Sequence, residues 1–202
     1  MPLPVKSPLF AKSLLRVLLL AILPLTVQAN EDLLAHVEDK AIQTLLQEAL
    51  DAAEQLTFNP TIIRAVRLQN AEQLSMDEIL KRDQAWQQSD ELDDFKRSLQ
   101  TNKAGRLLTR MVSVNSKFTE IFLTDSKGAN VAAYPATSDY WQGDEDKFSQ
   151  CFGPAKPVVL KPQMDRSTNT FSAQVSMPVR DGQQVIGVLV VGINLSGMRN
   201  GG

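Results

Sequence analysis

The 202-residue sequence contains only one cysteine and one histidine, which excludes several classes of function. Cys151 cannot form a disulfide within the chain, so we expect a buried, small, apolar side chain. Common zinc and haem sites need clusters of cysteine and histidine. His36 cannot complete a Ser-His-Asp triad of the hydrolase kind, because no G-x-S-x-G turn presents a serine. No glycine-rich phosphate-binding loop is present either, so we expect no enzyme, no metal site and no cofactor.

Excess positive charge and long apolar runs are also lacking. The sequence has 21 Lys and Arg against 23 Asp and Glu, a balance that argues against nucleic-acid binding. The apolar run Val17–Leu25 is nine residues long, whereas a membrane-spanning helix needs about 20. A second apolar run, Val185–Ile193, is interrupted by two glycines and predicts a buried strand.

The first 29 residues have the three parts of a secretory signal. Three basic residues and no acidic one precede the apolar core Val17–Leu25, and Val27 and Ala29 are small residues suited to a cleavage site. We therefore predict export, with residues 1–29 as a signal peptide and a mature chain that starts at Asn30. The alternative is a signal that stays uncleaved as an anchor.

The next part of the chain has the patterns of α-helices. Apolar residues recur every three or four positions over residues 30–57 without Gly or Pro, which predicts one long helix. Asn59-Pro60 is typical of a helix start. Ser75-Met-Asp-Glu78 is a capping box that predicts a further helix. Residues 89–113 are predicted to be helical as well.

From residue 118 onward the patterns are those of β-strands. Residues 170–179 alternate strictly between the two faces of a strand. One face carries Phe171, Ala173, Val175, Met177 and Val179, and the other carries Ser172, Gln174 and Ser176. The predicted strands cover residues 118–124, 130–134, 158–160, 170–179 and 185–193. Helices followed by a five-stranded antiparallel sheet make an α+β fold.

Residues 135–152 are predicted to be mostly loop, with a short helix near Glu145–Phe152, and they concentrate the candidate binding residues. Tyr140 and Trp141 stand between the acids Asp139 and Asp144, and aromatic walls with fixed carboxylates suit a small cationic or polar ligand. The open alternative is that the two aromatic residues only fix the loop onto the sheet. The acidic residues of this loop lack the D-x-D-x-D-G order of a calcium site, so a solvated acidic loop is favoured. They are Asp139, Asp144, Glu145 and Asp146.

The order of these motifs resembles the Cache family of extracytoplasmic, PAS-like sensor domains of bacteria. The resemblance covers roughly residues 31–195. Its most specific part is Ser138-Asp-Tyr-Trp-Gln-Gly-Asp-Glu145, followed by the paired strands Ser172–Val179 and Val185–Ile193. The hairpin Ile121-Phe-Leu-Thr-Asp-Ser-Lys-Gly128 with Asn130–Tyr134 also belongs to it.

The resemblance implies a PAS-like, five-stranded antiparallel sheet beside the long N-terminal helix, with the domain body over residues 58–197 and a tail over 198–202. It implies a pocket between the sheet and the aromatic loop for an amino acid, an amine or a small carboxylate. Carried over by position, the pocket residues are Tyr134, Asp139, Tyr140, Trp141 and Asp144. Arg166 could pair with a ligand carboxylate, or be a solvent-facing turn residue.

The resemblance also implies a role in signalling. Most such domains are tethered by membrane helices to a kinase or chemotaxis module, and this sequence shows neither a second membrane segment nor such a module. We therefore expect a periplasmic sensor that binds a small molecule and signals through a membrane receptor or kinase. The alternative is an interaction module that binds no ligand, such as a homodimer formed along the N-terminal helix.

Overall fold

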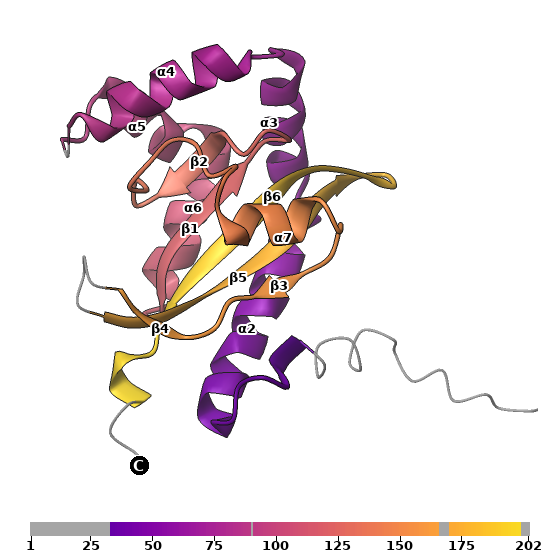
Figure 1. Cartoon of the computed structure of the whole chain (residues 1–202), viewed down its shortest axis with the longest axis vertical. Coiled ribbons are helices and arrows are strands. Elements are labelled where there is room, and N and C mark those ends of the chain that lie inside the picture. Colours follow the sequence, from indigo (N-terminus) through magenta and orange to yellow (C-terminus); the bar gives the residue numbers. More distant parts are fainter. Residues whose placement is uncertain (1–32, 90, 166–169, 199–202) are drawn as a thin grey trace, which may run out of the picture.

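The computed structural model describes residues 33–89, 91–165 and 170–198 (Figure 1). Helices come first: α2 (Lys40–Thr57), α3 (Pro60–Ala71), α4 (Met76–Gln87), α5 (Asp94–Thr101) and α6 (Lys103–Val114). The strands are β1 (Phe118–Thr124), β2 (Asn130–Tyr134), β3 (Val158–Val159), β4 (Gln163–Asp165), β5 (Thr170–Asp181) and β6 (Gln184–Asn194). The described residues also form two shorter helices, α7 (Asp146–Phe152) after β2 and the 3-10 helix η1 (Ser196–Met198) after β6.

Polar side chains fix where the helices begin. Asn59 accepts a hydrogen bond from the backbone N–H of Thr61 at the start of α3 (2.8 Å), and Ser75 accepts one from Glu78 at the start of α4 (3.2 Å). Both predicted helix starts are therefore confirmed. A cap of this kind stabilises a helix by about 1 kcal/mol.

The N-terminal helix begins later than the sequence predicted. Apolar spacing predicted one helix over residues 30–57, whereas α2 begins at Lys40 after a stretch of turn and coil. The reason is Asp39, whose carboxylate accepts hydrogen bonds from two backbone N–H groups of the first turn (2.8 and 3.2 Å) while its own backbone is extended. Leu34 and Val37 before the break are also buried, so the apolar pattern does not reveal it.

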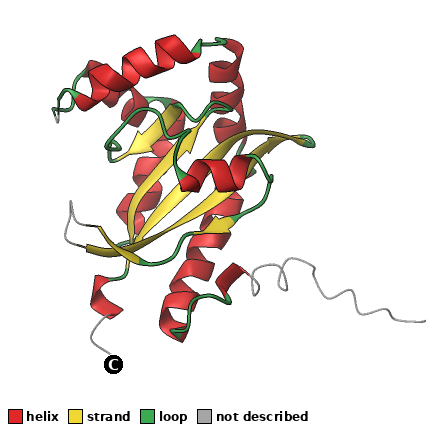
Figure 2. Ribbon diagram, in the orientation of Figure 1, coloured by secondary structure: helices red, strands yellow, loops and turns green. Residues whose placement is uncertain are grey.

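Six strands form one antiparallel sheet in the order β2-β1-β6-β5-β3, and β4 pairs with the first part of β5. The predicted α+β class and the predicted strands are confirmed. The additional strand β4 is three residues long, which is too short for an alternating pattern to show. Figures 1 and 2 show α2 behind the sheet and α7 in front of it.

The two faces of the sheet bury different side chains. The apolar residues of β5 pack with α2, α3 and α6 in the main core, as their alternation predicted. On the opposite face, α7 covers a smaller apolar cluster that contains Phe122, Phe148 and Cys151. Ser172 and Gln174 of β5 lie beyond this cluster, so part of that face remains polar.

The predicted signal peptide over residues 1–29 lies outside the described residues. Within the part of the chain that the structure describes, no helix combines the length and the apolar character that crossing a membrane requires.

Candidate functional site

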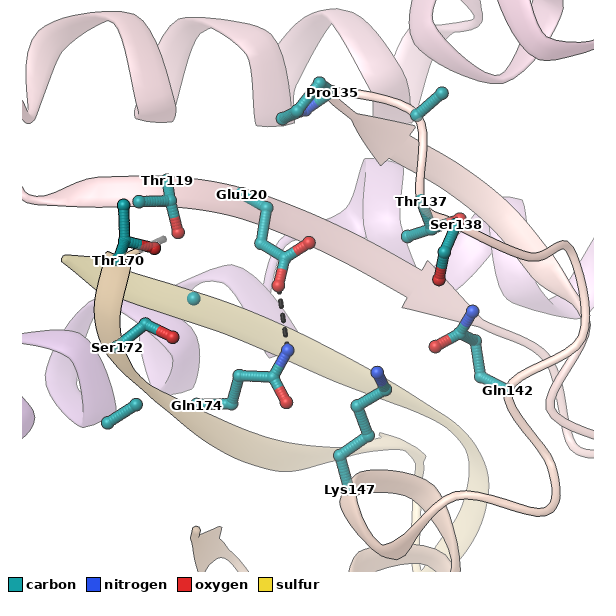
Figure 3. Close-up of a pocket in the computed structure, with 13 residues that line it drawn as sticks. Thr119, Glu120, Pro135, Thr137, Ser138, Gln142, Lys147, Thr170, Ser172 and Gln174 are labelled. Atoms are coloured by element: carbon teal, nitrogen blue, oxygen red, sulfur yellow. Dashed lines mark hydrogen bonds between the residues drawn. The ribbon is translucent and has the colours of Figure 1, made fainter. Parts of the chain in front are cut away.

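A cavity of about 540 Å³ lies on the polar face of the sheet, below the loop that follows β2 (Figure 3). Strands β1, β5 and β6, the loop and α7 all contribute walls. Most of the lining residues carry polar side chains: Thr119, Glu120, Thr137, Ser138, Gln142, Lys147, Thr170, Ser172 and Gln174. A concave site with several polar groups of fixed position is suited to a small polar molecule.

Glu120 on β1 is the acidic group of the cavity. It shares one row of the sheet with Gly192 on β6 and Gln174 on β5. The carboxylate accepts a hydrogen bond from the Gln174 amide (2.8 Å), so the Glu120 side chain crosses over β6. A Cβ at position 192 would lie 2.5 Å from Cγ of Glu120, which explains why glycine is needed there.

Lys147 on α7 is the basic group of the cavity. Its side chain is only 11 % exposed, and its Nζ lies 2.9 Å from a carboxylate oxygen of Glu145. The Nζ also lies 5.4 Å from the centre of the Phe122 ring, within the range of a cation–π contact. Figure 3 shows the ends of Lys147 and Glu120 pointing into the same space, so the cavity offers both signs of charge.

Gln142 is a residue of the cavity wall with a polar atom left unpaired by the described residues. It is fully buried, and its Nε2 donates to the backbone oxygen and the carboxylate of Asp139 (2.9 and 2.6 Å). Its Oε1 has no hydrogen-bond partner among the described residues. Because buried acceptors are nearly always paired, this oxygen is expected to accept a hydrogen bond from water or from a bound molecule.

The aromatic loop is held by a carboxylate on α4. Asp83 accepts hydrogen bonds from the backbone N–H groups of Tyr140 (2.8 Å) and Trp141 (2.9 Å). The Tyr140 ring is 1 % exposed and packs against Trp86 and Phe95, with ring centres 5.9 and 5.2 Å away. Burial raises the pKa of the Tyr140 hydroxyl, and Arg82 beside it partly offsets the rise. This ring therefore faces the helices and not the cavity.

Trp141 ties the loop to the β1–β2 turn. Its Nε1 donates to the backbone oxygen of Lys127 (2.8 Å), and its ring lies so close to Gly143 that a Cβ there would be 2.4 Å from Nε1. Tyr140 and Trp141 thus do what the structural alternative expected, which is to fix the loop onto the fold. A direct contact of either ring with a ligand stays a prediction.

The residues predicted as ligand contacts are spread over several environments. Tyr134 packs against the main core on the other face of the sheet, and Asp144 is exposed. Asp139 reaches the cavity indirectly, through its hydrogen bonds to Gln142. Arg166 lies outside the described residues. The structure therefore brings the predicted loop to the cavity, while side chains other than the predicted ones line it.

Sequence reasoning missed Glu120, Gln142, Lys147 and Gln174. One signal was available, because the alternation of β5 already placed Gln174 on the polar face of its strand. The hydrogen bonds that Asp83 accepts from the aromatic loop could not be predicted, because Asp83 lies 57 residues before Tyr140. Among the described residues, no three His, Cys, Asp or Glu side chains lie close enough together to hold a metal ion.

Cys151 on α7 is fully buried beside the cavity, as expected for a small apolar side chain. Burial raises the pKa of its thiol to about 12, and the neighbouring Arg180 opposes the rise. Since the thiolate is the reactive form, burial disfavours reaction of this cysteine near neutral pH.

No family model and no curated protein matches this chain. Solved structures do match it. The ligand-binding domain of the Pseudomonas aeruginosa PAO1 amino acid chemoreceptor PctC, in complex with GABA, is 17 % identical over 75 % of this chain and 62 % of that chain, with a TM-score of 0.36. The sensor domain of the Vibrio cholerae histidine kinase DctB is 16 % identical over 79 % and 61 %, with a TM-score of 0.35.

An enzyme is among the matches too. A type II free methionine-R-sulfoxide reductase from Thermoplasma acidophilum is 18 % identical over 51 % of this chain and 77 % of that chain, with a TM-score of 0.35. Sensor domains of chemoreceptors and histidine kinases are the class that the Cache resemblance predicted. This chain spans 62 % of the PctC structure and 61 % of the DctB structure. Because these TM-scores are below 0.5, the fold of this chain is assigned from its own strand order and packing.

Proposed function

We propose that this chain is an exported sensor that binds a small polar molecule in the cavity between Glu120 and Lys147. The observation that carries the proposal is the buried Oε1 of Gln142, which lines the cavity without a partner among the described residues. A buried acceptor without a donor costs about 1–3 kcal/mol. A ligand N–H or O–H group at this position would recover that free energy.

The charges of the cavity favour a ligand that carries an amino group, a carboxyl group or both. One oxygen of Glu120 is occupied by Gln174, and the other faces the open space, where it can accept from an ammonium group (Figure 3). Lys147 can donate to a carboxylate in exchange for part of its pairing with Glu145. Charge-assisted hydrogen bonds of this kind are about twice as strong as neutral ones.

The loop residues singled out by the sequence enter the proposal mainly as supports. Asp139 orients Gln142, while Tyr140 and Trp141 hold the loop that carries Gln142 over the sheet. Direct contacts with a ligand stay predictions for all six residues: Tyr134, Asp139, Tyr140, Trp141, Asp144 and Arg166. Because the loop is anchored from both sides, the cavity is preorganised, which lowers the free-energy cost of binding.

Ligand screening tests the proposal. We expect the melting temperature of the purified protein to rise with at least one member of a panel of amino acids, amines and small carboxylates, because a ligand at 100 times its Kd stabilises by about 2.7 kcal/mol. Glu120→Gln should then weaken binding of an amine-bearing hit at least tenfold. The matched control is Glu48→Gln, at an exposed position of α2. A panel without any shift, or equal binding by both variants, would refute it.

Export and a signalling partner form the second half of the proposal. Support comes from the basic leader and the apolar core of residues 1–29 and from the Cache resemblance. Protein recovered from a periplasmic extract should begin at Asn30. Recovery of only the intact N-terminus in the membrane fraction would instead identify residues 17–25 as an anchor.

The alternative, a homodimer along the N-terminal helix, needs apolar side chains exposed on that helix. The large apolar residues of α2 are buried, from Ile42 to Leu56. None of the exposed large apolar side chains of the described region belongs to α2. Pull-downs from a periplasmic extract with the wild type and with Trp141→Ala distinguish the two functions. Docking through the helix should not depend on the loop, so both proteins should then recover a partner equally well.

A further inference from the structure

A second cavity, of about 610 Å³, lies among the helices and is separate from the cavity on the polar face of the sheet. Helices α3, α5 and α6 supply most of its walls, with Arg82 from α4 and Val131 from β2. Tyr140 contributes to this cavity, whereas Thr137, Ser138 and Gln142 of the same loop line the first one. The aromatic loop therefore contributes to two cavities with different lining residues.

The walls of the second cavity include large apolar side chains that water reaches. Leu68 on α3 is 57 % exposed and Phe95 on α5 is 37 % exposed. The exposed face of a helix usually carries polar residues, so these two apolar side chains are unusual. Behind them Leu99, Ala104 and Val131 are buried. An apolar group placed between Leu68 and Phe95 would remove apolar surface from water on both, which is favourable in proportion to the area covered.

The charge of this cavity is positive, in a protein whose acidic residues outnumber its basic ones. Arg64, Arg82 and Lys103 line it, against the single acid Glu72. Arg82 is paired with Glu78 (3.2 Å), while Arg64 and Lys103 form no ion pair within the described part of the chain. Two cations without acidic partners next to apolar walls attract an anion that has an apolar part.

We propose that this second cavity binds a small carboxylate with an apolar tail, such as a medium-chain fatty acid. The tail lies between Leu68 and Phe95, and the carboxylate accepts hydrogen bonds from Arg64 and Lys103. The cavity volume is within the range of small-molecule sites, about 300–1,000 Å³. The commitment to a carboxylate follows from charge complementarity, since neither a neutral nor a cationic amphiphile would use the two cations.

Calorimetric titration of the purified full chain with octanoate, below its critical micelle concentration, tests this proposal. We expect saturable binding that the double substitution Arg64→Glu and Lys103→Glu weakens at least tenfold. Arg110→Glu is the control, because this arginine is an exposed residue of α6 outside the cavity. Leu68→Asp should also weaken binding, and its exposed position keeps the fold intact.

Two further probes decide the chemistry. Acetate should bind at least tenfold more weakly than octanoate, because it lacks the tail, and octylamine should not compete with octanoate. Equal binding of octanoate and octylamine, equal affinities of the double variant and Arg110→Glu, or no saturable binding of octanoate would each overturn the proposal. The double variant and Arg110→Glu should both bind the ligand of the sheet cavity as the wild type does. A failure of the octanoate experiments therefore leaves the proposed sensor function untouched.

Discussion

The two faces of the central sheet are packed for different tasks. On the face covered by α2, side chains such as Leu46 and Val175 are fully buried in a continuous apolar core. The other face has a small apolar cluster and a cavity. On its strands and on the loop over it, three buried polar atoms have no hydrogen-bond partner among the described residues: Oγ of Ser176, Oδ1 of Asn130 and Oε1 of Gln142. The first face stabilises the fold, whereas the unpaired buried atoms of the second reduce its contribution to stability.

The largest effect is expected from the apolar face. Leu46→Ala should lower the free energy of unfolding by about 3 kcal/mol, because it leaves a cavity where the side chain is fully buried. Urea denaturation gives the value. Leu80→Ala is the control, since Leu80 is 45 % exposed and should change the free energy by no more than about 0.5 kcal/mol. Similar losses at the two positions would contradict the described core.

The next effect concerns the anchor of the aromatic loop. Asp83→Ala removes the acceptor of two backbone N–H groups, and we expect a loss of about 2 kcal/mol together with faster amide exchange at Tyr140 and Trp141. Hydrogen-exchange mass spectrometry and urea denaturation measure both. Asp77→Ala, an exposed acid in the first turn of the same helix, should cost at most about 1 kcal/mol and leave the loop protected. Unchanged amide exchange at Tyr140 and Trp141 in Asp83→Ala would show that other contacts hold the loop.

The pH dependence of the free energy of unfolding tests whether water reaches the small apolar cluster that contains Cys151. Burial raises the pKa of the Cys151 thiol from 9.0 to about 12, so the folded chain keeps a proton that the unfolded chain loses. The contribution to stability is complete below pH 9 and is lost as the pH rises towards 12. At pH 10 the free energy of unfolding should be lower than at pH 8 by about 1.4 kcal/mol from this thiol.

The measurement is the difference between the wild type and Cys151→Ala at both pH values, because other groups titrate equally in the two proteins. If the two proteins lose the same free energy between pH 8 and pH 10, the thiol is accessible to water. Reaction of Cys151 with a thiol reagent at pH 8 in the native protein would lead to the same conclusion.

The smallest effect is expected on the polar side of β5. Ser176→Ala removes a buried hydroxyl without a partner, so the free energy of unfolding should change by less than about 0.5 kcal/mol or rise slightly. Val175→Ala, one residue away on the apolar face, should instead lose about 2 kcal/mol. A large loss for Ser176→Ala would mean that its hydroxyl has a partner, and the contrast between the faces would weaken.

The sequence could predict most elements because their signals are local. The cap at Ser75 involves neighbouring residues, and the alternation of β5 reflects one strand with two different faces. The continuous helix predicted over residues 89–113 is wrong, because α5 begins only at Asp94 and the chain breaks at Asn102, whose side chain caps α6. Two further misses also have physical causes. Buried residues on both sides of Asp39 hid the true start of α2, and β4 is too short to show a pattern.

The candidate site could be predicted only as a region. The sequence by itself determined that a loop with two aromatic residues and several acids lies next to the sheet. It could not determine that Tyr140 faces the helices, because the deciding contact comes from Asp83, far away in the chain. The cavity residues Glu120, Gln142 and Lys147 come from a strand, a loop and a helix, and only the strand order β1-β6-β5 and the position of α7 bring them together. Periodicity fixes which face of an element is buried, whereas the partner across that face is chosen by tertiary packing.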